Sequence, residues 1–93
     1  MPYELLYSPA AAASLDTLEA DPMMAKALEA VNDLLDRLED DPFDRRLGTI
    51  SFHLAHQEGV CATPVRYDDW YVIWERGGQP GAVWIIEIAQ LGS

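Results

Sequence analysis

Residues 65–74 read Val-Arg-Tyr-Asp-Asp-Trp-Tyr-Val-Ile-Trp, a polar pair between two segments rich in apolar and aromatic residues. Asp68-Asp69 has the short polar side chains that are typical of turns. The flanking segments, 60–67 and 70–75, contain the β-branched and aromatic residues that favour strands. This stretch therefore predicts a β-hairpin whose two strands are joined at Asp68-Asp69.

Further strands are expected on both sides of this hairpin. From Ile50 onward apolar residues alternate with polar or small ones, which predicts a strand that ends near 57–59. Residues 82–89 are almost continuously apolar, a pattern typical of a strand covered on both faces. Residues 77–81 include three glycines and predict the turn before that strand. Because Pro64 has no N–H to donate, the strand that contains it is expected at a sheet edge or with a bulge.

The N-terminal half predicts one strand and two helices. Apolar alternation over 3–7 predicts the strand, and Ser8-Pro9 is a favourable start for a helix over 10–20. Asp21-Pro22 repeats this start signal, and the second helix is expected to end near 40–42, before a proline. Its apolar residues recur every three or four positions, which places them on one face. These residues are Met24, Leu28, Val31, Leu35 and Leu38.

The order of these elements predicts an α+β fold in a single domain, 1–93. A strand and two helices precede an antiparallel meander, and both helices are expected on one face of the sheet. A hydrophobic fraction of 49% in 93 residues allows a core and excludes intrinsic disorder.

Charge is distributed unevenly along the chain. The net charge is −10, of which residues 1–44 carry −9 and residues 45–93 carry −1. An acidic chain repels phosphate at long range, so general binding to duplex DNA, RNA or an anionic membrane is not expected. The near-neutral second half still leaves room for a local arginine site.

Few residues favour a metal, a cofactor or an oxidising compartment. His53 and His56 are the only histidines, and their odd separation on a strand sends them to opposite faces. Cys61 has no second thiol for a disulfide, and no apolar run is long enough to span a bilayer. We therefore expect a cytoplasmic protein without metal, cofactor or membrane contact.

Arginines and aromatic residues form the most informative group of candidate binding residues. Guanidinium groups and aromatic rings on a sheet can hold phosphates and stack bases. The same residues can equally pack against helices and pair with the many carboxylates. The candidates for contact with RNA or a partner are Arg45, Arg46, Tyr67, Trp70 and Arg76.

The layout and residues 65–74 together resemble the RelE/ParE toxin superfamily of type II toxin–antitoxin systems. Residues 3–10 are similar to that family's first strand and helix start, and residues 35–42 to the end of its second helix. Residues 65–74 resemble the family pattern of an apolar residue, Arg, two or three turn residues, Gly or Asp, an aromatic, Arg, two aliphatics and an aromatic. The resemblance implies the family's small α+β fold, βααβββ in shorthand, with an antitoxin that lies across helices and sheet.

The resemblance also implies a site, from which this chain departs. Ribosome-dependent members cut mRNA by attack of a ribose 2′-hydroxyl, which needs cations for the phosphate and groups for proton transfer. Arg66 matches a family arginine, but Tyr71 replaces the expected fourth-strand arginine and Gln90-Leu91 replace the final basic pair. The chain also stops before a C-terminal catalytic tyrosine. The remaining catalytic candidates are Arg66 for phosphate, Tyr71 or Tyr67 as hydroxyl donor, and His53 or His56 as base.

Three functions remain open at this stage. The first is a toxin-like component that acts mainly through protein binding, as the family's gyrase-directed branch does. The second is an mRNA endonuclease with an atypical site, and the third is an interaction domain with no toxin role. A cognate antitoxin, a ribosome, mRNA or gyrase-like target and a homo-oligomer are the expected partners. A basic aromatic face near Arg66 would favour the nuclease, and an acidic face would oppose it.

Overall fold

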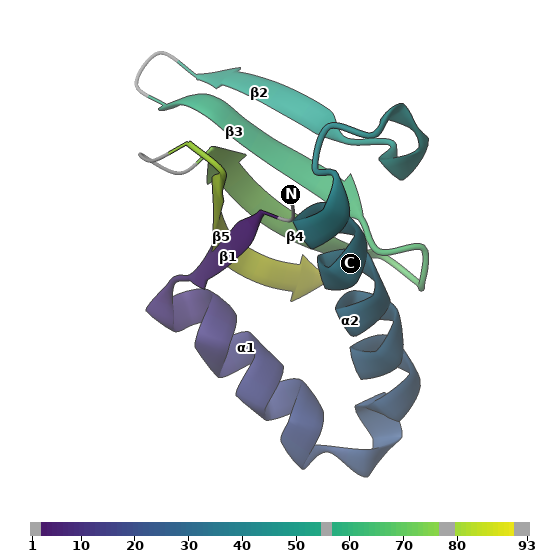
Figure 1. The fold of residues 1–93 in the computed structure, drawn as a ribbon. Helices are drawn as coiled ribbons and strands as arrows, with labels where there is room; N and C mark the ends of the chain where they lie inside the picture. The colour runs from purple at the N-terminus through teal and green to yellow at the C-terminus, as the bar shows by residue number, and fades with distance from the viewer. Residues whose placement is uncertain (1–2, 55–56, 77–79, 91–93) are drawn as a thin grey trace.

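The computed structural model describes residues 3–54, 57–76 and 80–90 and has the predicted α+β architecture (Figure 1). A first strand and two helices precede four further strands, one more than the shorthand βααβββ counts. The strands are β1 (Glu4–Tyr7), β2 (Ile50–Leu54), β3 (Gln57–Pro64), β4 (Trp70–Arg76) and β5 (Ala82–Gln90). The helices are α1 (Pro9–Ala20) and α2 (Ala25–Asp40), with short 3₁₀ helices η1 (Pro22–Met24) and η2 (Arg45–Leu47).

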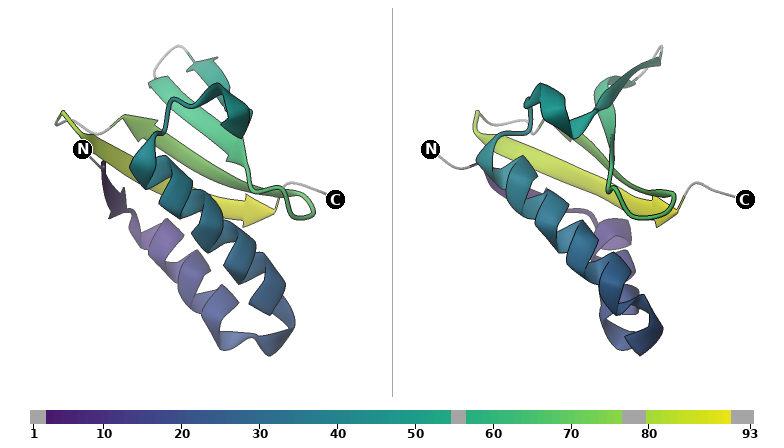
Figure 2. Two further views of the ribbon diagram at one scale, coloured as in Figure 1. Left: turned by 45° about the vertical axis from the view of Figure 1, so that its right-hand side comes forward. Right: turned by 90° about the vertical axis from the view of Figure 1, so that its right-hand side faces the viewer.

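The five strands form one mixed sheet in the order β1-β5-β4-β3-β2. Strands β2 to β5 form an antiparallel meander, and β1 pairs in parallel with β5. Strand β5 lies between β1 and β4, and seven of its nine residues are buried or half-buried. The prediction that it is covered on both faces is wrong, because both helices lie on one side of the sheet (Figure 2) and Glu87 on the strand is exposed. The crossover from β1 to β5 runs through the two helices and the meander.

Both helices lie on the same side of the sheet (Figure 2). The α2 residues Val31, Leu35 and Leu38 are buried in one cluster with Val72 and Trp74 of β4. Met24 and Leu28, the first two positions of the predicted stripe, are half-buried against the same cluster. The 4-and-3 spacing therefore identifies the buried face of α2 correctly.

Serine 8 and Asp21 start the helical segments, as predicted. The Ser8 Oγ accepts a hydrogen bond from the Ala11 N–H and donates one to the Ile86 carbonyl, which ties α1 to β5. The Asp21 carboxylate accepts from the Met23 N–H, but it caps η1, and α2 begins only at Ala25.

The end of α2 is held against the sheet by aromatic contacts. Helix α2 ends at Asp40, two residues before the buried Pro42. The ring of Phe43 lies edge-on to Tyr3 and Trp74, with centroids 6.0 and 6.1 Å away. These contacts direct the chain from α2 toward η2.

The predicted boundary between β2 and β3 is wrong, and the prediction for the strand that contains Pro64 holds in part. Gln57 belongs to β3, which starts there, whereas β2 already ends at Leu54. Gly59 suggested a turn, but it lies inside β3 with a positive φ of 89°. Strand β3 is not an edge strand, because β2 and β4 flank it, but it has the alternative feature that was expected, a bulge, where it has one residue more than β2 between the Val60–Phe52 and Gln57–Leu54 pairs. Pro64 is tolerated there because it is the last residue of β3, beyond the Ile50–Ala62 pair where β2 begins.

Candidate functional site

Arg66 lies in the turn between β3 and β4, with a positive φ of 69°. A left-handed backbone is uncommon for a bulky residue. Asp68 in the same turn also has a positive φ, of 52°. The Val65 N–H donates to the Trp70 carbonyl across 2.9 Å and closes this hairpin at Asp68-Asp69, as predicted.

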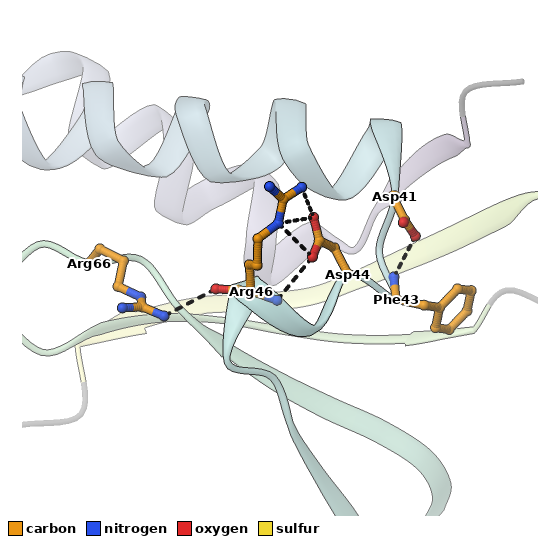
Figure 3. A network of polar contacts seen from close by, with 5 residues as sticks. All are labelled: Asp41, Phe43, Asp44, Arg46 and Arg66. Atoms are coloured by element: carbon orange, nitrogen blue, oxygen red, sulfur yellow. Dashed lines mark hydrogen bonds and ion pairs between the residues drawn. The ribbon is translucent and has the colours of Figure 1, made fainter.

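The Arg66 guanidinium reaches from this turn to η2 (Figure 3). Its Nη2 donates to the Arg46 carbonyl oxygen across 3.3 Å. Gly48 ends η2 with a φ of 72°, and a Cβ added there would lie 3.2 Å from the same Nη2. Glycine at 48 thus permits both the left-handed end of η2 and the close approach of Arg66.

Asp44 and Arg46 form a local pair at the start of η2 (Figure 3). The Asp44 carboxylate accepts from the Arg46 backbone N–H and from its guanidinium, with an Nη2–Oδ2 distance of 2.8 Å. These hydrogen bonds lower the pKa of Asp44, and the carboxylate raises the pKa of Arg46. The Arg46 side chain is 89% exposed, so water screens the pair.

A cavity of about 240 Å³ separates α2 from η2 and the Arg66 turn. Three arginines line it, Arg37, Arg46 and Arg66. Asp33, which pairs with Arg37 across 3.4 Å, also lines it. The cavity can therefore accept an anion, but carboxylates already offset two of its three cations. The remaining lining residues are Leu34, Leu47, Pro64 and Val65.

Tyr71 lies on the other face of the sheet. Its neighbours along β4, Trp70 and Val72, pack into the core beneath the helices, so the alternation of the strand turns Tyr71 away. In the sheet Tyr71 pairs with Pro64 and Ala89. It is not among the residues that line the cavity beside Arg66.

The same alternation defines the face of the sheet opposite the helices, which we call the open face. No described helix packs on it. Strand residues between core positions point to this face, and cross-strand partners share it. Its half-buried apolar residues include Leu6, Tyr71, Ile73, Trp84 and Ala89, and its charged residues among the described side chains are Glu4, Glu75 and Glu87. Among the described side chains the open face is apolar and acidic.

The other predicted site residues are dispersed. Arg45 is exposed at the start of η2, and Tyr67 is 39% exposed in the Arg66 turn. Trp70 packs partly against the core, which removes much of its ring from contact with RNA. His53 belongs to β2 and Arg76 ends β4, but both side chains lie outside the described part.

Gln90 and Leu91 replace the basic pair that the family resemblance leads one to expect near the C-terminus. The Gln90 side-chain amide donates to Asp68 Oδ2 across 2.9 Å, so it binds the turn between β3 and β4. His56 and Leu91 lie outside the described residues. Within the described ranges no group of three or more His, Cys, Asp and Glu side chains could hold a metal ion. No described helix is long and apolar enough to cross a bilayer.

Sequence reasoning missed the contribution of Arg37 and the acidic character of the open face. The Asp33/Arg37 spacing of four residues on a helix was a usable signal for an ion pair. The glutamates of the open face could be assigned to it only once the strand register was known, because one residue of slip moves each side chain to the other face.

Comparison with known proteins identifies the fold. No protein-family profile matches the sequence, and a comparison with curated proteins finds no significant match. Solved structures do match over almost the whole chain. A YoeB/ParE toxin from Agrobacterium tumefaciens superimposes with a TM-score of 0.78 at 12% identity, covering 96% of this chain and 99% of that one.

Two further solved structures support the same assignment. An archaeal RelE–RelB complex from Pyrococcus horikoshii matches with a TM-score of 0.71 at 16% identity, covering 99% of this chain and 98% of that one. A YoeB dimer from Staphylococcus aureus matches with a TM-score of 0.70 at 10% identity over both whole chains. The chain therefore has the fold of the RelE/ParE-type toxins, as its sequence resemblance predicts.

Proposed function

We propose that the chain is the toxin component of a type II toxin–antitoxin pair in a bacterial cytoplasm, and that it acts by protein contact. The toxin role is supported by the fold, which it shares with toxins named YoeB, ParE and RelE. The contact mechanism is supported by the open face, where the described side chains are half-buried apolar residues and glutamates without an ion pair to any described residue, and not the cations that RNA would need. That observation carries the proposal.

Cleavage of RNA is poorly supported by the groups that would perform it. A scissile phosphate needs cations aimed at its developing charge. The Arg66 guanidinium instead donates to a backbone carbonyl beside α2, and Tyr71 lies on the open face with Glu75 and Glu87. Gln90, at the position of the family's basic pair, donates to Asp68.

We further propose a cognate antitoxin as the first partner, because one solved neighbour is a RelE–RelB complex. A gyrase-like protein suits a mechanism of binding better than a ribosome carrying mRNA does, since protein surfaces tolerate an acidic partner that RNA phosphates repel. A homodimer is a third proposed association, because one neighbour is a YoeB dimer.

An mRNA endonuclease with an atypical site is the second candidate. It is favoured by one observation, that Arg37, Arg46 and Arg66 line a single cavity of about 240 Å³. In this mechanism Arg66 holds the phosphate, and Tyr71 of β4 and His53 of β2 are the candidates for proton transfer, although Tyr71 does not line the cavity.

Growth after induction, together with mRNA cleavage in a translating extract, distinguishes these functions. We expect the wild-type chain, Arg66→Ala and the matched control Arg45→Ala all to arrest growth without cutting mRNA. Arg45 is a suitable control because it is an exposed arginine of the same 3₁₀ helix. Circular dichroism of each variant shows that it is folded.

Each alternative result supports another function. Cleavage that Arg66→Ala abolishes and Arg45→Ala preserves would establish the endonuclease. Growth that continues with all three proteins, at equal expression, would leave an interaction domain without a toxin role.

A further inference from the structure

The open face carries charge of one sign across three strands. Glu4 of β1, Glu75 of β4 and Glu87 of β5 all project from it, and none forms an ion pair with a described residue. No described cation shares this face with them. Unpaired carboxylates on an otherwise apolar surface favour contact with a cationic partner.

Two apolar residues at the centre of the open face lie beside these carboxylates. Trp84 pairs with Leu6 on one side and Glu75 on the other. Ile73 pairs with Ala62 and with Glu87. Trp84 and Ile73 are only half-buried, so each keeps apolar area that a partner can remove from water.

Charge distinguishes the occupants that such a face can accept. A second copy of the chain would bring a second set of the same three glutamates against the first, and RNA would bring phosphates; both are repelled. A protein segment in which apolar residues alternate with Lys or Arg satisfies both parts of the face. Its apolar residues cover Trp84 and Ile73, and its cations pair with the carboxylates beside them.

We propose that the open face binds a basic, amphipathic segment of the antitoxin partner, with Lys or Arg opposite Glu75 and Glu87. This inference rests on the proposed function, to which it adds the site and the charge of the partner segment. It predicts an association that weakens as salt concentration rises, because the carboxylates are near the surface.

Two synthetic peptides of 15 residues test the inference. They share leucine at alternate positions and carry either lysine or glutamate at the others. Binding of fluorescently labelled peptide to the full chain is measured by anisotropy at low and high salt. We expect the lysine peptide to bind at least about tenfold more tightly than the glutamate peptide, and more weakly at high salt.

Three variants locate the binding on the open face. Glu75→Gln combined with Glu87→Gln is expected to reduce the preference for the lysine peptide several-fold, and Trp84→Ala to weaken its binding. The matched control, Asp16→Asn with Glu19→Gln, removes two charges from the exposed side of α1 and is expected to change little. Equal losses in the two double variants would show that only net charge matters and would overturn the inference.

Other outcomes also decide the matter. Equal affinity for both peptides, binding of neither, a dimer that Trp84→Ala dissociates, or tight binding of single-stranded RNA to the same face would each overturn it. Growth arrest without peptide binding rejects this inference alone. Peptide binding without growth arrest keeps the docking face and rejects the toxin role, so the two failures are distinguishable.

Discussion

The two faces of the sheet are formed by the same strands but differ in how far their side chains are buried and paired. On the face beneath the helices, Trp74 is 1% exposed and its indole Nε1 donates to the buried Thr63 hydroxyl across 2.8 Å. On the open face, Trp84 is half-buried and its cross-strand neighbour Glu75 has no ion-pair partner among the described residues. The difference indicates that the first face stabilises the fold, whereas the second remains available for a partner.

The largest effect is expected when the two tryptophans are compared directly. Trp74→Ala removes a fully buried ring and should lower the free energy of unfolding by about 3–5 kcal/mol. Trp84→Ala should lower it by only about 1–2 kcal/mol, because Trp84 is half-buried and part of its surface already faces water. Urea unfolding measures both values, and equal losses would show that the open face is part of the core.

The polar contact beneath the helices gives the next largest effect. Thr63→Val keeps the shape of the side chain but leaves the buried Trp74 N–H without its acceptor, at a cost of about 1–3 kcal/mol. Thr63 also shares a hydrogen bond of 2.7 Å with Thr49. The control is Ser51→Ala, whose exposed hydroxyl has only a 3.8 Å contact with Cys61 Sγ and which should unfold like the wild type. A Thr63→Val variant with the same free energy of unfolding as the wild type would mean that water reaches this face.

The hydrogen bonds that attach α1 to β5 are the third feature of the helix-covered face that a variant can test. Ser8→Ala removes the cap of α1 and the hydrogen bond to the Ile86 carbonyl, and we expect a loss of about 0.5–2 kcal/mol. Ser14→Ala removes a hydroxyl contact to the preceding turn of the same helix and should cost less than 0.5 kcal/mol. Thermal unfolding measures the stability that each variant loses. Equal losses for Ser8→Ala and Ser14→Ala would contradict the role of Ser8 in attaching α1 to the sheet.

The smallest effect concerns the exposed Asp44–Arg46 pair at η2. Its hydrogen bonds hold the Asp44 pKa below the usual 3.8, so the pair stabilises the fold above that pH. This contribution is lost as the pH falls through the lowered pKa and Asp44 becomes protonated. We expect Asp44→Asn to lower Tm slightly at pH 7 and to have no further effect in acid. If Asp44→Asn lowered Tm more in acid than at pH 7, the stabilisation by this pair would increase as the pH falls, which is the opposite of the expected pH dependence.

The elements of the fold were predictable because they depend on local patterns. The 4-and-3 spacing of α2 marks its buried face, and the proline at 42 marks its end. The start of β3 was missed, since Gly59 carries the signal of a turn although it lies within a strand. The parallel pairing of β1 with β5 joins segments about 80 residues apart, and no local pattern encodes it.

The candidate site was less predictable because it depends on register. Tyr71 and Trp70 are adjacent in sequence, but one lies on the open face and the other packs toward the helices. Arg66 could be named from its resemblance to a family arginine. Its contact with the Arg46 carbonyl depends on a left-handed turn and on Gly48, which only the folded chain shows.

In the proposed function the open face, and not the arginine cavity, carries the activity. Growth arrest after induction of Ile73→Ser and Arg66→Ala, in one strain and at equal levels of folded protein, tests it most directly. Ile73 is half-buried on the open face, and Arg66 lines the cavity. We expect Ile73→Ser to abolish growth arrest and Arg66→Ala to preserve it. Arrest that survives Ile73→Ser and disappears with Arg66→Ala would contradict it.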